Sequence, residues 1–391
     1  MVSARPAVAG MPAYRPGRNP ADLAREIGVD RAVKLASNEV AFPPLPAVLQ
    51  AIAATVGETN RYPDNGATLV AAALADRYGV EPGQVVVGCG AVTVCQQVTQ
   101  AFSDPGTSIA FAWPSFEIYP LLAQVAAART QQVPLVPGTP GGAPDTHDLD
   151  GIAAVVDETT RLVFICNPNN PTGTAVRRAE LVRFLDAVPA ETLVVLDEAY
   201  REFVTDPDVP DGVELMRGRP NVAVLRTFSK AWGMAGLRVG YLLAEDPAVA
   251  DAVRRTHMPF SVNMLGQAAA VAALASEDEV RQRCAAVVAE RDRLTGELRR
   301  RGLPVADSQA NFVWLPLGER TASVAAALER RAVITRPFAG AGLRVTVGTP
   351  QEDDAFLGAL DAVLTDTPPV TEPSGSAGPS RHGERAGVRG T

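Results

Sequence analysis

Short apolar runs alternate with helical patterns through the middle of the chain. Residues 161–166, 193–196 and 222–225 are strand-like runs, and the segments between them have apolar positions at helical spacing. Short apolar strands that alternate with helices are typical of a mostly parallel sheet with both faces covered. The pattern therefore predicts an α/β fold with a mostly parallel central sheet.

The pattern also divides the chain into four parts. Residues 1–45 are irregular and rich in proline, and we expect an arm that contributes to a small domain. The alternating pattern of the large domain fills residues 46–275. Residues 276–366 read as a smaller α+β domain. From residue 367 to 391 the chain has Pro, Ser, Gly and charge without aromatic residues, which predicts disorder.

A long helix is predicted at the start of the smaller domain. Ser276 and Glu279 have the spacing of a capping box, in which the two side chains satisfy each other's backbone N–H groups. We therefore expect the helix to begin there and to run to Arg301.

Composition excludes several classes of protein. A net charge of −8 argues against a nucleic-acid partner, and no apolar run approaches the roughly 18 residues of a membrane span. The first residues lack the apolar core of a signal peptide. Four cysteines without CxxC spacing and three scattered histidines do not suit a metal centre. We expect a cytoplasmic protein with reduced cysteines and with no metal, nucleic-acid or membrane partner.

Polar residues follow three successive strands of the predicted sheet. Asn-Pro-Asn-Asn-Pro-Thr-Gly occupies 167–173, Asp-Glu-Ala-Tyr occupies 197–200, and Thr-Phe-Ser-Lys occupies 227–230. Open α/β sheets bind ligands at the carboxyl ends of their strands. These three segments therefore predict one composite site.

Lysine is rare in this chain, and one lysine lies in that site. Lys34 and Lys230 are the two lysines among 36 basic residues. Arginine does not lose its proton, whereas a desolvated lysine does and can then form a Schiff base with a carbonyl. Lys230 is therefore the candidate nucleophile, although a surface lysine beside a glycine-rich turn has the same pattern.

A glycine loop joins the predicted strand 84–87 to a helix. It reads Gly-Cys-Gly-Ala-Val-Thr over residues 88–93. A strand, a glycine loop and a helix in this order offer backbone N–H groups to a phosphate. Thr93 stands where a dinucleotide fingerprint has its third glycine, so the loop favours a phosphate site of another kind.

Together these motifs resemble those of fold-type I pyridoxal-phosphate aminotransferases, over about residues 12–364. The order and spacing match at residues 167–173, 197–200, 229–230 and 236–240. The branch most similar to the chain comprises the histidinol-phosphate and aromatic amino acid aminotransferases. The features that indicate this branch are residues 14–17, 60–63, 308–312 and 344–348.

The resemblance implies pyridoxal 5′-phosphate as the cofactor and assigns roles around its ring. Lys230 would form the internal aldimine and then shuttle a proton. Asp197 would pair with the pyridine nitrogen and keep it protonated, so that the ring acts as an electron sink. Tyr200 and Asn170 would hydrogen-bond the phenolic oxygen. Phe116 would stack on the ring.

A second set of residues is assigned to the phosphate and to the partner subunit. The phosphate would be held by Arg238, Thr227, Ser229 and the amides of Ala91 and Val92. Tyr62 matches a tyrosine that reaches the phosphate from the neighbouring subunit, so the resemblance implies a homodimer.

A third set is assigned to the amino acid and 2-oxo acid substrates. Arg344 matches the arginine that forms a bidentate pair with the substrate carboxylate. Arg336 is a candidate for the side-chain end of the substrate, and Tyr14 and Asn38 complete the substrate-binding set.

The substrate itself is less strongly specified. Phe116 occupies the stacking position, where histidinol-phosphate enzymes more often have tyrosine. With Trp113 and residues 337–340, it resembles the aromatic (phenylalanine) branch. We therefore expect transfer from an aromatic L-amino acid to 2-oxoglutarate. Histidinol phosphate as the donor stays open, as does a decarboxylase or lyase, because fold alone does not settle reaction type.

Plain structural interpretations stay open for the same residues. Asp197 also suits a solvated turn, Phe116 suits core packing, and Arg238 suits an ordinary surface position. Val40 and Ala41 depart from the asparagine and proline that the family usually has after Asn38 and Glu39. A protein that binds the cofactor without turnover is the remaining alternative.

Overall fold

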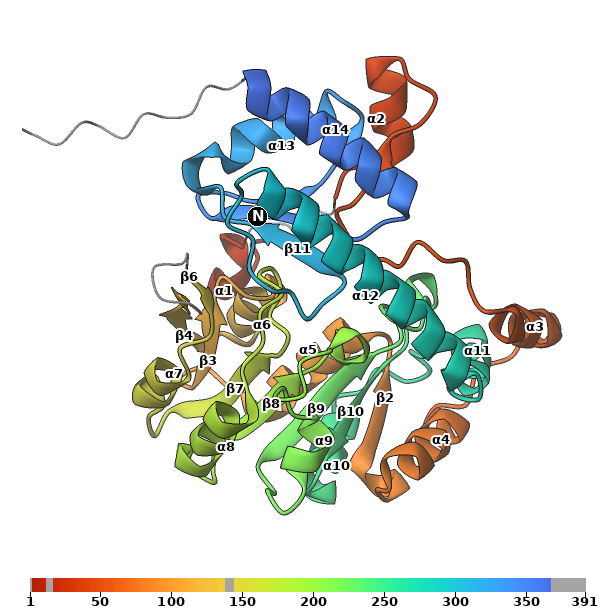
Figure 1. Cartoon of the computed structure of the whole chain (residues 1–391). Helices are drawn as coiled ribbons and strands as arrows, with labels where there is room; N and C mark the ends of the chain where they lie inside the picture. Colours follow the sequence, from red (N-terminus) through yellow and green to blue (C-terminus); the bar gives the residue numbers. More distant parts are fainter. Residues whose placement is uncertain (1, 12–16, 138–143, 367–391) are drawn as a thin grey trace, which may run out of the picture.

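The computed structural model describes residues 2–11, 17–137 and 144–366 (Figure 1). Tyr14 and the tail predicted to be disordered lie outside these residues. Within the described residues, none of the helices combines the length and the apolar character needed to cross a bilayer. The domain boundaries given by the sequence stay predictions.

Seven strands of the described chain form the main sheet, in the spatial order β2-β10-β9-β8-β7-β3-β4 (Figure 1). They are β2 (Val85–Gly88), β10 (Gly240–Ala244), β9 (Val222–Thr227), β8 (Leu193–Asp197), β7 (Thr160–Cys166), β3 (Ser108–Trp113) and β4 (Arg129–Pro134). From β9 to β4 each neighbouring pair is parallel. The α/β fold with a mostly parallel sheet is confirmed.

Strand β8 shows why these runs are apolar throughout. Leu193 and Val195 lie in an apolar cluster on one face of the sheet, and Val194 and Leu196 lie in the cluster on the other face. Successive side chains of a strand point to opposite faces, so a strand covered on both sides has no polar face. The only polar residue of β8 is Asp197, at the carboxyl end of the strand.

Helices cover both faces of the main sheet. The cluster that contains Leu193 and Val195 is closed by α5 (Ala91–Phe102), α6 (Ile118–Ala126) and α10 (Pro247–Arg255). The opposite cluster receives residues from α3 (Pro46–Thr55), α4 (Thr68–Tyr78), α7 (Leu149–Val155), α8 (Arg178–Ala187), α9 (Gly212–Met216) and α11 (Met264–Leu274). The result is a three-layer arrangement.

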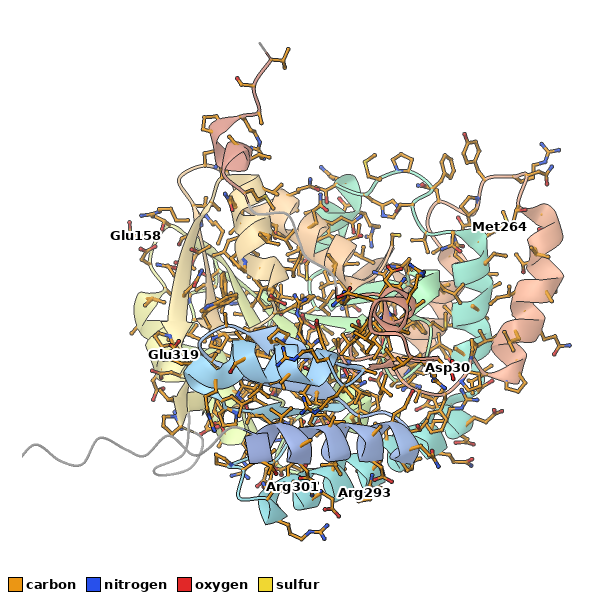
Figure 2. All side chains as sticks on the ribbon, turned by 90° about the horizontal axis from the view of Figure 1, so that it is seen from above. Asp30, Glu158, Met264, Arg293, Arg301 and Glu319 are labelled. Carbon is orange, nitrogen blue, oxygen red and sulfur yellow. The ribbon has the colours of Figure 1, made fainter. Side chains whose placement is uncertain are left out.

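A smaller sheet of three described strands lies above the main sheet in Figure 1, in the order β11-β14-β13. It consists of β11 (Phe312–Leu315), β14 (Gly342–Thr346) and β13 (Arg336–Phe338), all antiparallel. The helices α12 (Glu277–Arg300) and α13 (Thr321–Glu329) pack with it, and α14 (Pro350–Asp366) packs on these two helices. In Figure 2, Arg293 and Arg301 mark α12 beside α14, where they pair with Asp354 and Asp361.

The N-terminal segment contacts both units: α1 (Pro6–Ala9) packs on α6 of the main sheet, and β1 (Val33–Lys34) joins the smaller unit. After α1 and α2 (Pro20–Ile27), strand β1 pairs in parallel with β12 (Val333–Ile334). Beside the main sheet, β5 (Val136–Pro137) and β6 (Pro144–Thr146) form a short antiparallel pair. Residues 35–38 lead from β1 toward the space between the two sheets.

The capping box predicted at Ser276 is wrong, although the helix that it announced is present. The Ser276 hydroxyl donates to the carbonyl oxygen of Ala272 at 3.0 Å, and its amide donates to that of Ala273 at 2.9 Å. Ser276 therefore bonds back to the last turn of α11, and its side chain makes no cap to α12. Three acidic residues, 277–279, instead favour the helix N-terminus through its dipole.

Strand β10 was not anticipated, and it runs antiparallel to both of its neighbours, β2 and β9. Its first residue, Gly240, lies against the start of α5. A Cβ atom added to Gly240 would lie 2.3 Å from the Ala91 amide nitrogen and 2.7 Å from the Gly90 carbonyl carbon. The absence of a side chain at Gly240 is therefore what allows β10 and α5 to meet.

We expect Gly240→Ala to lower the free energy of unfolding by about 1–3 kcal/mol, the usual effect of overpacking a close contact. Gly236→Ala is the matched control, because a Cβ atom there meets nothing within 4 Å. Urea unfolding followed by circular dichroism measures both variants. Equal midpoints for the two variants would contradict the close approach.

Candidate functional site

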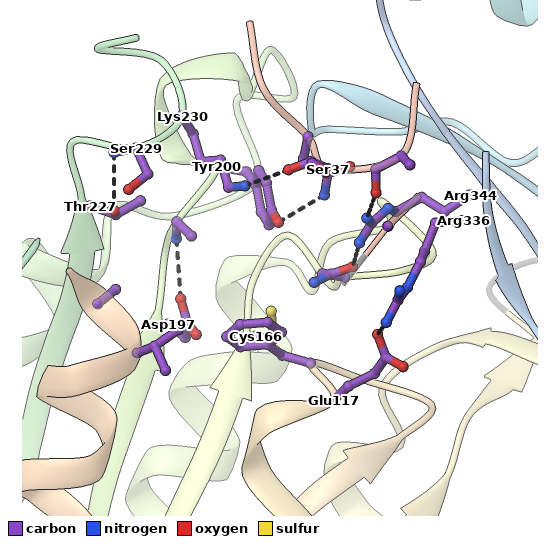
Figure 3. Close-up of a pocket in the computed structure, with 18 of the residues that line it drawn as sticks. Ser37, Glu117, Cys166, Asp197, Tyr200, Thr227, Ser229, Lys230, Arg336 and Arg344 are labelled. Atoms are coloured by element: carbon purple, nitrogen blue, oxygen red, sulfur yellow. Dashed lines mark hydrogen bonds and ion pairs between the residues drawn. The ribbon is translucent and has the colours of Figure 1, made fainter. Parts of the chain in front are cut away.

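A pocket opens at the carboxyl ends of β7, β8 and β9, between the main sheet and the smaller one (Figure 3). Most of the site residues predicted from the sequence line it. They are Lys230, Asp197, Tyr200, Ala91, Val92, Phe116, Asn170, Thr227, Ser229, Arg238, Asn38, Arg336 and Arg344. The composite site expected at this edge of the sheet is therefore present as one cavity.

Lys230 reaches into the pocket from the segment after β9. Its Nζ donates to the Ser37 carbonyl oxygen at 3.0 Å (Figure 3). Burial lowers the pKa of the Lys230 amine to about 7, the positive charges of Arg344 and Arg238 act in the same direction, and Asp197 opposes them. A large fraction of the amine is therefore neutral near pH 7 and available as a nucleophile.

Asp197 ends β8 on the floor of the pocket. Burial raises the pKa of its carboxyl to about 6. Three contacts hold this pKa down: the Tyr119 hydroxyl donates to Oδ2 at 2.7 Å, the Ala199 amide donates to Oδ1 at 3.3 Å, and Lys230 adds positive charge. These contacts keep a buried carboxylate ionised near neutral pH.

Tyr119 is a part of the site that the sequence did not indicate. It lies in α6, fully buried, with its ring stacked on Phe164 at a centroid distance of 4.6 Å. One turn earlier, Phe116 lines the pocket. In the sequence, a tyrosine at this position of an apolar helix indicates a core residue. The packing of α6 on the sheet is what brings its hydroxyl to Asp197.

Arg344 is fixed at the opposite wall by contacts from three segments. Its Nη1 donates to Asn170 Oδ1 at 2.5 Å, and its Nη2 donates to the Ala36 carbonyl oxygen at 2.6 Å (Figure 3). The Phe312 ring lies 5.5 Å from the guanidinium carbon. A planar guanidinium held in this way is suited to bidentate binding of a carboxylate.

Asn38 and Tyr200 join the N-terminal segment to the end of β8. Asn38 Nδ2 donates to the Tyr200 hydroxyl oxygen at 2.9 Å, and the Asn38 amide donates to the Thr346 hydroxyl at 2.9 Å. Burial raises the pKa of Tyr200 above its usual value, and the charge of Arg344 opposes this. The Tyr200 phenol therefore stays protonated and can donate a hydrogen bond into the pocket.

An anion-binding cradle lies at the other end of the pocket. Arg238 Nη1 donates to Ser229 Oγ at 3.3 Å, and the Ser229 amide donates to Thr227 Oγ1 at 3.1 Å. Gly90 has a φ of +84°, and a Cβ atom there would lie 2.4 Å from Arg238 Nη2. The helix α5 begins at the next residue, Ala91, and its first amides have no intrahelical acceptor.

Tyr62 is the predicted site residue that the structure does not bring into the pocket. It is 80% exposed, and its ring stacks on Phe260 at 4.6 Å. Tyr14 lies outside the described residues.

Glu117 lines the pocket and was not predicted. Among the described residues, no group of three His, Cys, Asp or Glu side chains is placed to hold a metal ion.

Residues 30–360 match the family model of aminotransferase class I and II. The chain belongs to this aminotransferase family. The match includes every residue that lines the pocket except Gly17.

Named relatives agree with this assignment. The aromatic amino acid aminotransferase of Streptomyces avermitilis is 54% identical over 348 residues, 89% of this chain and 94% of the relative. That of Thermobifida fusca is 53% identical over 354 residues, 90% and 95% of the two chains. A crystal structure of histidinol-phosphate aminotransferase from Sinorhizobium meliloti, in complex with pyridoxal-5′-phosphate, matches with a TM-score of 0.82. Its sequence identity is 30%, over 92% of this chain and 97% of that chain.

This aminotransferase has the fold-type I architecture and uses pyridoxal 5′-phosphate. The pocket fits that cofactor on its own geometry. An amine of lowered pKa, a buried ionised carboxylate and an anion-binding cradle of arginine, hydroxyls and helix amides line one cavity. Each matches one polar part of the cofactor: the aldehyde, the pyridine nitrogen and the phosphate.

We expect Tyr119→Phe to shift the acid limb of the kcat/KM profile to higher pH by roughly one unit, because a hydrogen bond to a charged group contributes about 1.5–3 kcal/mol. Removing the bond removes one contact that lowers the pKa of Asp197, so the carboxylate is protonated at a higher pH. Initial rates across the pH range measure the shift.

Tyr241→Phe is the control for Tyr119→Phe. Tyr241 is equally buried, but its hydroxyl bonds to that of Tyr78 at 2.7 Å. An identical acid limb in the unchanged enzyme and in Tyr119→Phe would show that Tyr119 does not act on Asp197.

Proposed function

We propose that this aminotransferase transfers the amino group of an aromatic L-amino acid to 2-oxoglutarate. The observation that carries the substrate class is the identity of more than half of the aligned residues with two aromatic amino acid aminotransferases. The geometry supports it: Arg344 is presented to a carboxylate, and the Phe116 side chain lines the same cavity.

We assign the chemical roles as follows. When bound, the cofactor supplies an electron-withdrawing ring that stabilises negative charge at Cα of the substrate. Arg344 binds and orients the substrate carboxylate. Lys230, as a neutral amine, takes the Cα proton and returns it. Asp197 would hold negative charge beside the pyridine nitrogen, and Tyr200 and Asn170 would provide hydrogen bonds to the phenolic oxygen.

The cradle binds the phosphate in this proposal. Arg238 supplies the charge, the hydroxyls of Thr227 and Ser229 supply hydrogen bonds, and the amides of Ala91 and Val92 complete it. Phe116, which lines the pocket, would cover the ring, and Asn38 keeps the Tyr200 hydroxyl in place. Substitution of Lys230 should abolish turnover, whereas substitution of the other residues should change its rate.

A homodimer is also part of the proposal. Tyr62 and Phe260 are exposed large apolar residues that stack on each other, and exposed apolar patches mark interaction sites. The Tyr62–Phe260 stack presents a phenol on this surface. We propose that it reaches the cofactor phosphate of the neighbouring subunit.

We further propose a cytoplasmic location. Cys89, Cys95, Cys166 and Cys284, all within the described residues, are free thiols. Free thiols are typical of a reducing compartment.

The substrate is tested by half-reactions of the cofactor-loaded enzyme without a keto acid. We expect L-phenylalanine to change the cofactor absorbance within the time of a normal turnover, and L-histidinol phosphate to leave it unchanged. A change with histidinol phosphate alone would overturn the aromatic assignment and indicate a histidinol-phosphate aminotransferase. Release of carbon dioxide from phenylalanine would indicate a decarboxylase.

The dimer is tested by subunit complementation. Lys230→Ala homodimers should be inactive, and Tyr62→Ala homodimers should lose roughly tenfold in kcat/KM for the loss of one phosphate contact. Mixing the two variants under conditions of subunit exchange should raise the activity. In a mixed dimer, one site would combine the intact Lys230 of the Tyr62→Ala subunit with the intact Tyr62 of the Lys230→Ala subunit. Activity equal to the average of the unmixed variants would contradict a shared site.

A further inference from the structure

An ion pair at the substrate end of the pocket joins the two sheets. Arg336 Nη2 donates to Glu117 Oε2 at 2.6 Å (Figure 3). Arg336 begins β13 of the smaller sheet, and Glu117 directly precedes α6 on the main sheet. Their side chains are 14% and 35% exposed, and both line the pocket. The pair therefore faces whatever ligand occupies the cavity.

The pairing of β13 with β14 in the smaller sheet makes Arg336 and Arg344 neighbours. They stand directly opposite each other in the β13–β14 register. Directly opposite residues of an antiparallel pair have their side chains on the same face, with Cβ atoms about 4.5–5.5 Å apart. A substrate whose carboxylate binds Arg344 therefore extends into space bordered by Arg336 and Glu117.

The charge of Glu117 changes what this space can bind. With Glu117 bonded to Arg336, the substrate meets an ion pair without net charge. A guanidinium paired in this way can still stack on an aromatic ring. A second substrate carboxylate meets repulsion from Glu117 and must compete with it for Arg336. Partly buried charge-assisted bonds of this kind are strong enough to affect binding.

We propose that Glu117 is a specificity-determining residue: by holding Arg336, it favours aromatic over dicarboxylic substrates at the side-chain end of the pocket. The inference rests on the proposed function, since it needs Arg344 to bind the substrate carboxylate. It assigns Glu117 a role that the sequence did not indicate.

The test compares the cofactor-loaded enzyme with Glu117→Gln in half-reactions with L-glutamate and with L-phenylalanine. Glutamine keeps the size of the side chain and removes its charge. We expect the ratio of kcat/KM for glutamate to that for phenylalanine to rise roughly tenfold, as for the loss of one competing charged bond. An unchanged ratio, or one that moves toward phenylalanine, would overturn the proposal.

Two further variants test the route through Arg336. In an Arg336→Gln background, Glu117→Gln should no longer shift the ratio, because there is no guanidinium to release. A full shift in that background would show that Glu117 acts without Arg336 and would refute the proposal. Glu214→Gln is the control, because it removes an exposed carboxylate that is bonded to Arg178 at 2.7 Å. This variant should have the same ratio as the unchanged enzyme.

The two proposals fail in different ways. If the unchanged enzyme does not react with phenylalanine, the aromatic assignment fails. If phenylalanine does react but the ratio of glutamate to phenylalanine is unchanged in Glu117→Gln, the role of Glu117 alone is refuted.

Discussion

The pocket depends on a buried carboxylate that keeps its charge. Asp197 lies at the end of a strand whose other residues are apolar and buried, and burial alone would favour its neutral form. The Tyr119 hydroxyl, the Ala199 amide and the Lys230 amine oppose that effect. The same desolvation that threatens Asp197 gives Lys230 its lowered pKa. One buried cavity therefore raises the pKa of the acid and lowers the pKa of the amine, which brings the two values close together.

The smaller sheet completes this cavity rather than merely covering it. Its strand β14 supplies Arg344, and residues 36–38 of the N-terminal segment supply the carbonyl and amide groups that hold Arg344 and Tyr200. The pairing of β1 with β12 is what brings that segment to the pocket. The substrate end of the site is thus built by segments about 300 residues apart in sequence.

The sequence predicted the parts of the site that follow directly from strand ends. Asp197, Tyr200 and Lys230 come after apolar runs, so the parallel topology alone brings them together. Tyr119 and Glu117 could not be predicted, because their partners are chosen by how α6 packs on the sheet and by how β13 approaches it. The direction of β10 was equally hidden, since an apolar run does not show which way its neighbours run.

A transaminase that uses an aromatic donor and a dicarboxylic acceptor has to place both in one cavity. A permanently free cation beside Arg344 would suit the acceptor and leave an unpaired charge against an aromatic ring. A wholly apolar wall would suit the ring and give a second carboxylate no partner. The Glu117–Arg336 pair lies between these extremes: its charges cancel when a ring is bound, and its guanidinium can be exchanged between two carboxylates. The strength of that one bond therefore sets the balance between the two substrates.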